Sequence, residues 1–400
     1  MNTSPTERRG PLSGVRVIEL AGLGAAPFGA MMLADMGAEV IRVDRHGLPD
    51  FMAFSEPRFD VMGRNRRSLA LNLKREGAVE VVLSLVDSAD VLLEAWRPGV
   101  AERLGVGPDV CLARKPSLVY GRMTGWGQSG PLAQAAGHDL NYIALAGMLY
   151  PLGEPDRPPR SPMNLIGDFG GGGMLLAFGV VCALLAARQS GRGQVVDAAM
   201  VDGAALLGSM NWGLFAEGRW QLERGSNTND CAAPYYSAYE CADGKFVSIA
   251  SAEPQFYALL RSKLGLAEDA AFDAQNDRSQ WPALKAQLTA LFRTRTRAQW
   301  CELMEGSDVC FAPVLDWNEA PRHPHAVARE AFIDVAGVTQ PRPAPRFSRT
   351  TVPAPSAPVA HGADTLAVLR EVGLSDARIL QLQQAGAIGD VLAPPSAARL

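Results

Sequence analysis

Short runs of apolar and β-branched residues alternate with helical patterns along the first half of the chain. Strands are predicted at residues 16–20, 40–44, 68–73, 91–94, 116–123 and 194–197, and helices at 28–37 and 76–88. This alternation is typical of βαβ units, in which parallel strands form a sheet that helices cover. The pattern therefore predicts an α/β fold with a Rossmann-like, parallel-sheet part.

The remaining pattern is more mixed and predicts a smaller α+β domain, at about residues 225–315. Residues 235–249 alternate around Asp243-Gly244, which is a favoured hairpin turn. Further helices are predicted at 174–188, 198–215, 253–264, 280–292, 366–372 and 376–385, with Ser375 as the N-cap of the last. Four consecutive glycines, 170–173, suit a helix interior poorly, so the apolar helix that follows is expected to begin near Met174.

Composition excludes several classes of protein. Hydrophobic residues make up 48% and charged residues 20% of the 400, which excludes intrinsic disorder as the main state. A net charge of −4 argues against a dedicated nucleic-acid binder. The six cysteines show no CxxC pair and no metal-ligand spacing, so we expect free, mostly buried thiols and no metal site. Residues 169–187 are long and apolar enough to span a membrane, but the glycines favour a buried core helix, and we expect no membrane insertion.

Charge is concentrated in one stretch, and a glycine loop precedes it. Residues 42–75 hold eight basic and four acidic side chains, a net charge of +4 that suits either an anion site or a solvated surface. The loop Gly22-Leu23-Gly24-Ala25-Ala26-Pro27 after the first strand, with Asp44 about 20 residues on, partly matches a dinucleotide-binding turn. Because the third glycine is missing, a structural turn or a different phosphate-bearing ligand remains open.

Three acid–base groups stand out in polar contexts. His138 lies in Gly137–Tyr142 (GHDLNY), just before an apolar helix. Asp168 precedes the glycine run, where it is either a helix cap or lies beside backbone N–H groups, at 168–171, that stabilise an oxyanion. Glu253 precedes a proline at a helix start, which alone is uninformative. A lone histidine is more often structural than catalytic, so these segments gain weight only together.

Together these segments resemble the α-methylacyl-CoA racemases of the class III CoA-transferase (CaiB/BaiF) superfamily. The resemblance runs from about Pro11 to about Thr350 and is carried by PLSGVRVIELAG, ADMGAEVIRVDR, RRSLALNLK, WRPG, GHDLNY, NLIGDFGGG, GQVVDAAMVDG and EPQFY. It implies the class III CoA-transferase fold in an interlocked homodimer. The large Rossmann-like, CoA-binding domain is then expected at 1–224, the small domain at 225–315, and a C-terminal segment that returns to the large domain at 316–400.

The resemblance also implies a role for each candidate residue. His138 and Asp168 match the two catalytic bases, and Glu253 matches the acid that orients the histidine, in the same chain or across the dimer. The residues that match the acyl-thioester end are Gly137, Asp139, Asn141 and Tyr142. Those that match contacts to the CoA nucleotide and its phosphates are Arg45, Leu71, Asn72, Leu73, Lys74 and Arg97. The family usually has Asp where Asn72 stands.

The implied reaction inverts the α-carbon of a 2-methylacyl-CoA thioester. One base removes the α-proton to give an enolate, and the other group returns a proton to the opposite face. Coenzyme A is part of the substrate, and no other cofactor or metal is expected.

Two alternatives remain open. One is a CoA-transferase with Asp168 as its nucleophile, which is disfavoured by the presence of His138 and by FVSIASAEPQ at 246–255 in place of a glycine-rich loop. The other is a non-catalytic acyl-CoA binder. A cytoplasmic location is expected, although Ala398-Arg399-Leu400 resembles a peroxisomal address if the source is eukaryotic.

Overall fold

A computed structural model describes residues 9–46 and 54–391 of the chain. The chain divides into two compact units: Met1–Ala146, Pro162–Gly208 and Glu330–Leu400 form the first, and Gly147–Ser161 and Ser209–Arg329 the second. The domain boundaries predicted at 225 and 315 both lie inside the second unit. Asp50, one of the four acidic residues counted between 42 and 75, lies outside the described residues. The C-terminal tripeptide 398–400 does so too, and the expected cellular location therefore stays a prediction.

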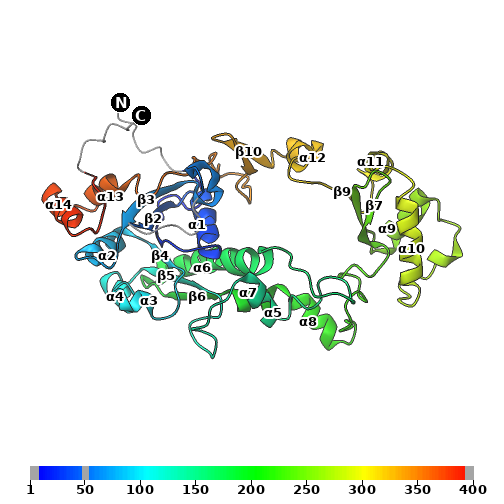
Figure 1. Ribbon diagram of the computed structural model, residues 1–400, viewed down its shortest axis with the longest axis horizontal. Helices are drawn as coiled ribbons and strands as arrows, with labels where there is room; N and C mark the ends of the chain where they lie inside the picture. The colour runs from blue at the N-terminus through cyan, green and yellow to red at the C-terminus, as the bar shows by residue number, and fades with distance from the viewer. Residues whose placement is uncertain (1–8, 47–53, 392–400) are drawn as a thin grey trace. The chain divides into compact units, whose positions relative to one another are not determined.

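The first unit is built on a six-stranded parallel sheet (Figure 1). Its strands are β1 (Arg16–Leu20), β2 (Glu39–Arg45), β3 (Arg66–Leu71), β4 (Val91–Glu94), β5 (Val119–Thr124) and β6 (Val195–Ala199). They lie in the order β3-β2-β1-β4-β5-β6, with every neighbouring pair parallel. This is the doubly wound order, whose direction reverses between β1 and β4. The predicted α/β class and all six predicted strands of this sheet are confirmed.

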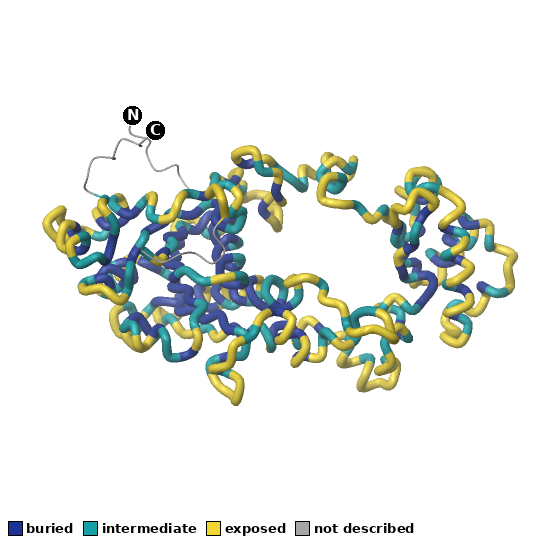
Figure 2. The backbone as a smooth tube through the Cα atoms, in the orientation of Figure 1, coloured by how far each residue is buried: buried dark blue, intermediate teal, exposed yellow. Residues whose placement is uncertain are grey.

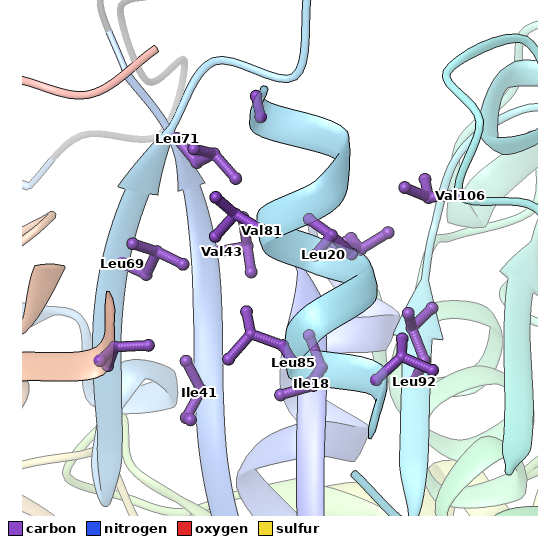
Figure 3. Packing of buried hydrophobic residues seen from close by; sticks show 14 of the residues in the cluster. Ile18, Leu20, Ile41, Val43, Leu69, Leu71, Val81, Leu85, Leu92 and Val106 are labelled. Carbon is purple, nitrogen blue, oxygen red and sulfur yellow. The ribbon is translucent and has the colours of Figure 1, made fainter. Parts of the chain in front are cut away.

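Alternating side chains of the strands fill two cores, one on each face of the sheet. Ile18, Ile41 and Leu92 pack with α2 (Ala78–Ser88) and α4 (Pro108–Arg114), as the close view of this core shows in part (Figure 3). Val17 and Val40 pack on the other face with α1 (Ala25–Asp35) and α6 (Leu175–Ser190). Because both faces are covered by helices, apolar side chains of the strands point to both sides of the sheet. Some charged strand residues are buried as well, such as Glu19 of β1, which pairs with Arg66 of β3.

The C-terminal helices belong to the same core as α2. The chain continues through α13 (Thr365–Glu371) and α14 (Asp376–Gln384), where Val368, Leu369 and Ile379 are fully buried. Ser375 caps α14 as predicted, since its Oγ accepts the N–H of Arg378 at 3.3 Å.

The second unit combines an antiparallel sheet with helices. β7 (Tyr236–Glu240) and β8 (Phe246–Ala250) form the predicted hairpin around Asp243-Gly244, and β9 (Phe311–Val314) adds a third strand that was not predicted. Helices α9 (Pro254–Leu264), α10 (Trp281–Phe292) and α11 (Arg297–Met304) share one hydrophobic core with this sheet. In both units the buried residues gather between sheet and helices (Figure 2). The shorter elements are α3 (Val100–Arg103), α5 (Asp139–Leu145), α7 (Met200–Leu207), α8 (Ser209–Ala216), α12 (Pro324–Ala328), β10 (Phe332–Val335) and β11 (Val338–Pro341).

The predicted start of the apolar helix at Met174 is wrong. A π-helix, η3 (Leu165–Met174), runs through all four glycines and continues directly into α6. The glycines allow close packing: a Cβ at Gly173 would lie 2.5 Å from the carbonyl oxygen of Ala25 in α1. A Cβ at Gly171 would lie 2.5 Å from the backbone nitrogen of Ala204 in α7. The missing side chains thus let η3 lie directly against α1 and α7.

Two further expectations can be compared with the structure. In the described part of the chain, the continuous helix Leu165–Ser190 is long and apolar enough to cross a membrane by length and composition, a test that core helices also pass.

All six cysteines are free, but Cys182 and Cys231 are exposed and Cys301 and Cys310 are half-buried. The expectation of mostly buried thiols is therefore wrong.

The glycine contacts predict an asymmetric response to added methyl groups. Gly203→Ala places a Cβ into the carbonyl group of Gly171, and we expect it to lower the free energy of unfolding by about 1–3 kcal/mol. Gly213→Ala, in α8, meets no atom within 4 Å and is expected to raise it by about 0.5–1 kcal/mol. Urea unfolding of both variants checks this, and equal midpoints would contradict the packing role of Gly203.

Candidate functional site

The predicted nucleotide-binding side chains lie where strands of the parallel sheet end. Arg45 is the last residue of β2 and is exposed, and its register partner on β3 is Leu71, the last residue of that strand. Asn72 and Lys74 follow β3 directly, and Arg97 follows β4; Lys74 and Arg97 are exposed. Ligands of doubly wound sheets bind at this carboxyl edge. Five of the predicted contacts therefore share one edge of the sheet.

Two residues of the same stretch face the core. Leu71 is 2% exposed and belongs to the core under α2, and Leu73 packs against that core. Asn72 shapes the turn, because its Oδ1 accepts the N–H of Lys74 at 3.1 Å and its own N–H donates to the carbonyl of Ala387. The side chains of Asn72 and Lys74 are thus able to contact a ligand. Leu71 and Leu73 instead pack into the core and support the turn that follows β3.

Most of the basic side chains between residues 42 and 75 are already neutralised. Five of the eight form ion pairs: Arg42 with Asp44 and Asp60, Arg58 with Glu56, Arg64 with Asp35, Arg66 with Glu19, and Arg67 with Glu39 and Glu371. Within the described residues, Arg45, Lys74 and Arg75 have no ion pair. The net charge of +4 therefore overstates the cationic surface, and these three side chains carry what remains of it.

Asp168 lies inside η3, next to the loop that follows β1. A Cβ placed on Gly24 would lie 3.1 Å from Oδ2 of Asp168, and Gly24 has φ 62°, which favours glycine. The Nδ2 group of Asn164 donates a hydrogen bond to the same Oδ2 at 3.1 Å. Asp168 is therefore not the cap of α6. It is a half-buried carboxylate beside the point where the sheet reverses direction.

The surroundings of Asp168 favour its protonated form. Burial raises the pKa of its carboxyl, and the negative charge of Asp139 raises it further. The hydrogen bond from Asn164 and the charge of His138 lower the pKa, but the raising effects prevail. A carboxyl with a raised pKa in an accessible position is a candidate proton donor and acceptor.

His138 immediately precedes α5 and is exposed. Its backbone N–H donates to Oδ1 of Asn141 at 3.1 Å, which fixes the start of the helix. The hydroxyl of Tyr142 donates to the carbonyl of Gly137, and the ring packs edge-on against Trp126 with centroids 4.8 Å apart. Burial raises the pKa of Tyr142 to about 12, so this phenol stays neutral. Asn141 and Tyr142 thus hold the turn that presents His138.

Asp139 connects this turn to η3. Its Oδ1 accepts the N–H of Gly167 at 2.6 Å and that of Asp168 at 2.8 Å. The N–H of Asp168 is therefore engaged, and the expectation that it would stabilise an oxyanion is wrong. Asp139 itself is 5% exposed, so its side chain supports the site from beneath.

Glu253 belongs to the second unit. It is the exposed N-cap residue of α9 and precedes Pro254. Burial raises the pKa of the Cys310 thiol, and the charge of Glu253 raises it further. Its pairing with His138 stays a prediction.

Within the first unit, the structure brings together His138, Asp139 and Asp168, with Tyr142 in electrostatic reach of Asp168 and Arg97. Sequence reasoning missed Asn164 as a site residue, although its position four residues before Asp168, about one helical turn, was the available signal. No group of three or more potential metal ligands occurs in the described ranges. A cavity of about 260 Å³ lies elsewhere and holds none of the predicted residues; it is lined by Ile333 and by residues 342, 343 and 345–355.

Comparison with known sequences assigns the family. The sequence profile of CoA-transferase family III matches residues 12–365. The chain belongs to CoA-transferase family III. This family III chain is 45% identical to mouse α-methylacyl-CoA racemase over 375 residues, covering 93% of this chain and 96% of the mouse one. It is 41% identical to the human α-methylacyl-CoA racemase over 379 residues, with the same coverage.

Transferases and solved structures of the family are also similar to it. The acetyl-CoA:oxalate CoA-transferase of Acetobacter aceti is 32% identical over 354 residues, covering 85% of this chain and 90% of its own. The crystal structure of a CAIB/BAIF family protein from Brucella suis has a TM-score of 0.76 at 28% identity, covering 91% of this chain and all of that chain. The similarity thus extends over both units of this family III chain.

The hydrogen bond from Asn164 predicts a measurable change at Asp168. Asn164→Ala removes a donor that stabilises the carboxylate, so we expect the pKa of Asp168 to rise further. A ¹³C NMR titration of aspartate carboxyl groups measures it, with Asp168→Asn assigning the resonance. An unchanged or lower pKa in Asn164→Ala would contradict the hydrogen bond.

Proposed function

We propose that this family III member inverts the α-carbon of 2-methylacyl-CoA thioesters by 1,1-proton transfer. The observation that carries the proposal is the placement of Asp168, a half-buried carboxyl with a raised pKa, in electrostatic contact with the exposed His138. The similarity to the mouse and human racemases over 93% of the chain supports it.

In the proposed reaction His138 and Asp168 exchange roles with the direction of inversion. One removes the α-proton as a base and leaves an enolate, and the other donates a proton to the opposite face. The raised pKa of Asp168 keeps a protonated carboxyl available and makes its carboxylate a stronger base. Glu253 orients the imidazole of His138 in this proposal, in the same chain or across a dimer.

Recognition of the CoA part is proposed for the carboxyl edge of the sheet. Arg45, Lys74 and Arg97 supply exposed cations for the phosphates, and Asn72 supplies an amide beside them. Gly137 and Tyr142 shape the turn at the thioester end. Coenzyme A enters as part of the substrate, and we propose no further cofactor or metal.

A second copy of the chain is the proposed partner. On α6, Phe178 and Leu185 are 67% and 61% exposed, and Val181 lies between them. Their spacing of three to four residues places them on one face of the helix, and an exposed apolar face of this kind is typical of a protein interface. We therefore propose a homodimer in which this face is covered.

The two proposed bases predict a shared loss of activity. We expect His138→Ala and Asp168→Ala each to lower racemisation by about 10²–10⁴-fold, because each removes one proton-transfer group. Binding of the acyl-CoA ester is expected to persist. The measurement is incorporation of solvent deuterium at the α-carbon of 2-methyldecanoyl-CoA, followed by NMR.

The same experiment includes a control variant and distinguishes the racemase from a CoA-transferase. Arg114→Ala removes an exposed cation paired with Asp87 and Glu80, and is expected to keep wild-type exchange. Wild-type exchange in both base variants would defeat the assignment. Acyl transfer to an added carboxylic acid, without deuterium incorporation, would favour the transferase with Asp168 as nucleophile.

The apolar face of α6 predicts a change in assembly. Phe178→Glu combined with Leu185→Glu is expected to convert the dimer to monomers, because two charges cannot be buried unpaired. Leu380→Glu, at an exposed apolar position of α14, is expected to leave the dimer intact. Sedimentation velocity measures the masses, and a dimer of the double variant would exclude this face as the interface.

A further inference from the structure

We propose that Asp139 is a positioning residue that fixes the separation of His138 and Asp168 by joining their two helices. The inference rests on the proposed function, since it concerns the two groups that would transfer protons. It changes the expected role of Asp139 from a substrate contact to a support beneath the site.

The contacts of one carboxylate oxygen carry this proposal. Oδ1 of Asp139 accepts hydrogen bonds from Gly167 and Asp168 at 2.6 and 2.8 Å, which link the start of α5 to η3. Asp139 follows His138 directly in the chain, and Asp168 donates its own N–H. One oxygen therefore ties the backbone of one proposed base to the residue next to the other.

The fit around this oxygen leaves little freedom. A Cβ on Gly167 would lie 2.5 Å from Oδ1 of Asp139 and 3.2 Å from the side chain of Ile143. The first N–H groups of a helix have no partner within it, and Asp139 supplies an acceptor from a different helix. Its contacts consequently determine both where η3 begins and how closely it approaches α5.

The negative charge of Asp139 indicates that this residue acts electrostatically as well as by positioning. The residue is 5% exposed, and its Oδ2 is buried with no hydrogen-bond partner among the residues that the structure describes. Burying an incompletely paired carboxylate is costly, and an uncharged amide would supply the same acceptor. Features that cost stability are found at functional sites, where they serve the chemistry.

The electrostatic consequence falls on Asp168. The charge of Asp139 raises the pKa of Asp168, while His138 and the amide of Asn164 lower it. Tyr142 of α5 is neutral below a pKa of about 12. The other charged residues on the elements packed against η3 are Asp35 at the end of α1, which pairs with Arg64, and the exposed Asp202 of α7, Asp197 of β6 and Arg188 of α6. Among the described residues, Asp139 is thus the carboxylate whose charge raises the pKa of Asp168.

The first test is Asp139→Asn, which keeps an acceptor oxygen and removes the charge. The neutral amide oxygen holds the two N–H groups less tightly than the carboxylate does, so we expect the reacting groups to shift slightly. Small displacements of this kind have large effects, so kcat for α-proton exchange of 2-methyldecanoyl-CoA should fall about 10- to 100-fold, with KM changed less than threefold. Where Asp168 acts as the base, the rate rises with pH through its pKa. Removing the charge lowers that pKa, so this limb of the pH–rate profile moves to lower pH.

Gly167→Ala tests the same contact from the other side. Its Cβ displaces the carboxylate without changing a charge, so kcat should fall while the pH limb moves less. If both variants act through one contact, the double variant is no worse than the more affected single variant. Asp364→Asn is the control, because Asp364 also accepts a backbone N–H from another element, that of Ser68, and it should keep wild-type kcat.

The outcomes separate the two proposals. Absence of α-proton exchange in the wild-type protein overturns the proposed function itself. Wild-type exchange together with unchanged kcat and pH profile in both Asp139→Asn and Gly167→Ala overturns the role of Asp139 alone. Additive losses in the double variant do so as well. If Asp139→Asn lowers the melting temperature strongly, the role of Asp139 is still tested by kcat of Gly167→Ala. The pH–rate profile of the Asp139→Asn protein that remains folded tests it as well.

Discussion

The backbone contact of η3 with α1 and α7 is the constraint on which the candidate site depends. Glycine lets the helices approach until backbone meets backbone, and a methyl group on Gly171 or Gly173 would end that approach. The approach in turn places the carboxylate of Asp168 beside Gly24, in the loop after β1. In a dinucleotide-binding fold, the corresponding loop cradles a pyrophosphate. Here a carboxylate of the protein lies against it, which explains why a partial glycine fingerprint accompanies a different chemistry.

Buried ion pairs stabilise the parallel sheet and neutralise some of its arginines, whereas other cations stay unpaired. Arg66 pairs with Glu19 at 2.6 Å, and Arg64 pairs with Asp35 at the end of α1, with both pairs almost fully buried. Arg64 also donates to Gln340 and to the carbonyl of Pro341, which ties the C-terminal part of the chain to α1. Removing one partner from such a pair is strongly destabilising. These arginines therefore stabilise the fold, and the unpaired cations at the strand ends are the ones that we propose for binding an anionic substrate.

The sequence predicted the elements whose signals are local. Strand positions, the hairpin and the Ser375 cap followed from periodicity and turn chemistry, and the structure confirms them. The π-helix was missed because glycine disfavours helices locally, whereas packing against α1 and α7 outweighs that preference. The excess charge was overstated because partners such as Glu19 and Glu371 lie far away in sequence. His138 and Asp168 could be found from motifs, but the hydrogen bonds of Asn164 and Asp139 required the fold.

The difference between the two proposed bases is itself informative. Unperturbed histidine and aspartate side chains differ in pKa by about 2.6 units, so an ordinary aspartate is the weaker base by more than two orders of magnitude. Inversion of an α-carbon interconverts two forms of similar energy, and efficient transfer in both directions favours acid–base groups of similar strength. Burial and the charge of Asp139 raise the pKa of Asp168 toward that of an imidazole. The same π-helix that places the carboxylate beside the sheet therefore also adjusts its basicity, because its position there is what buries it.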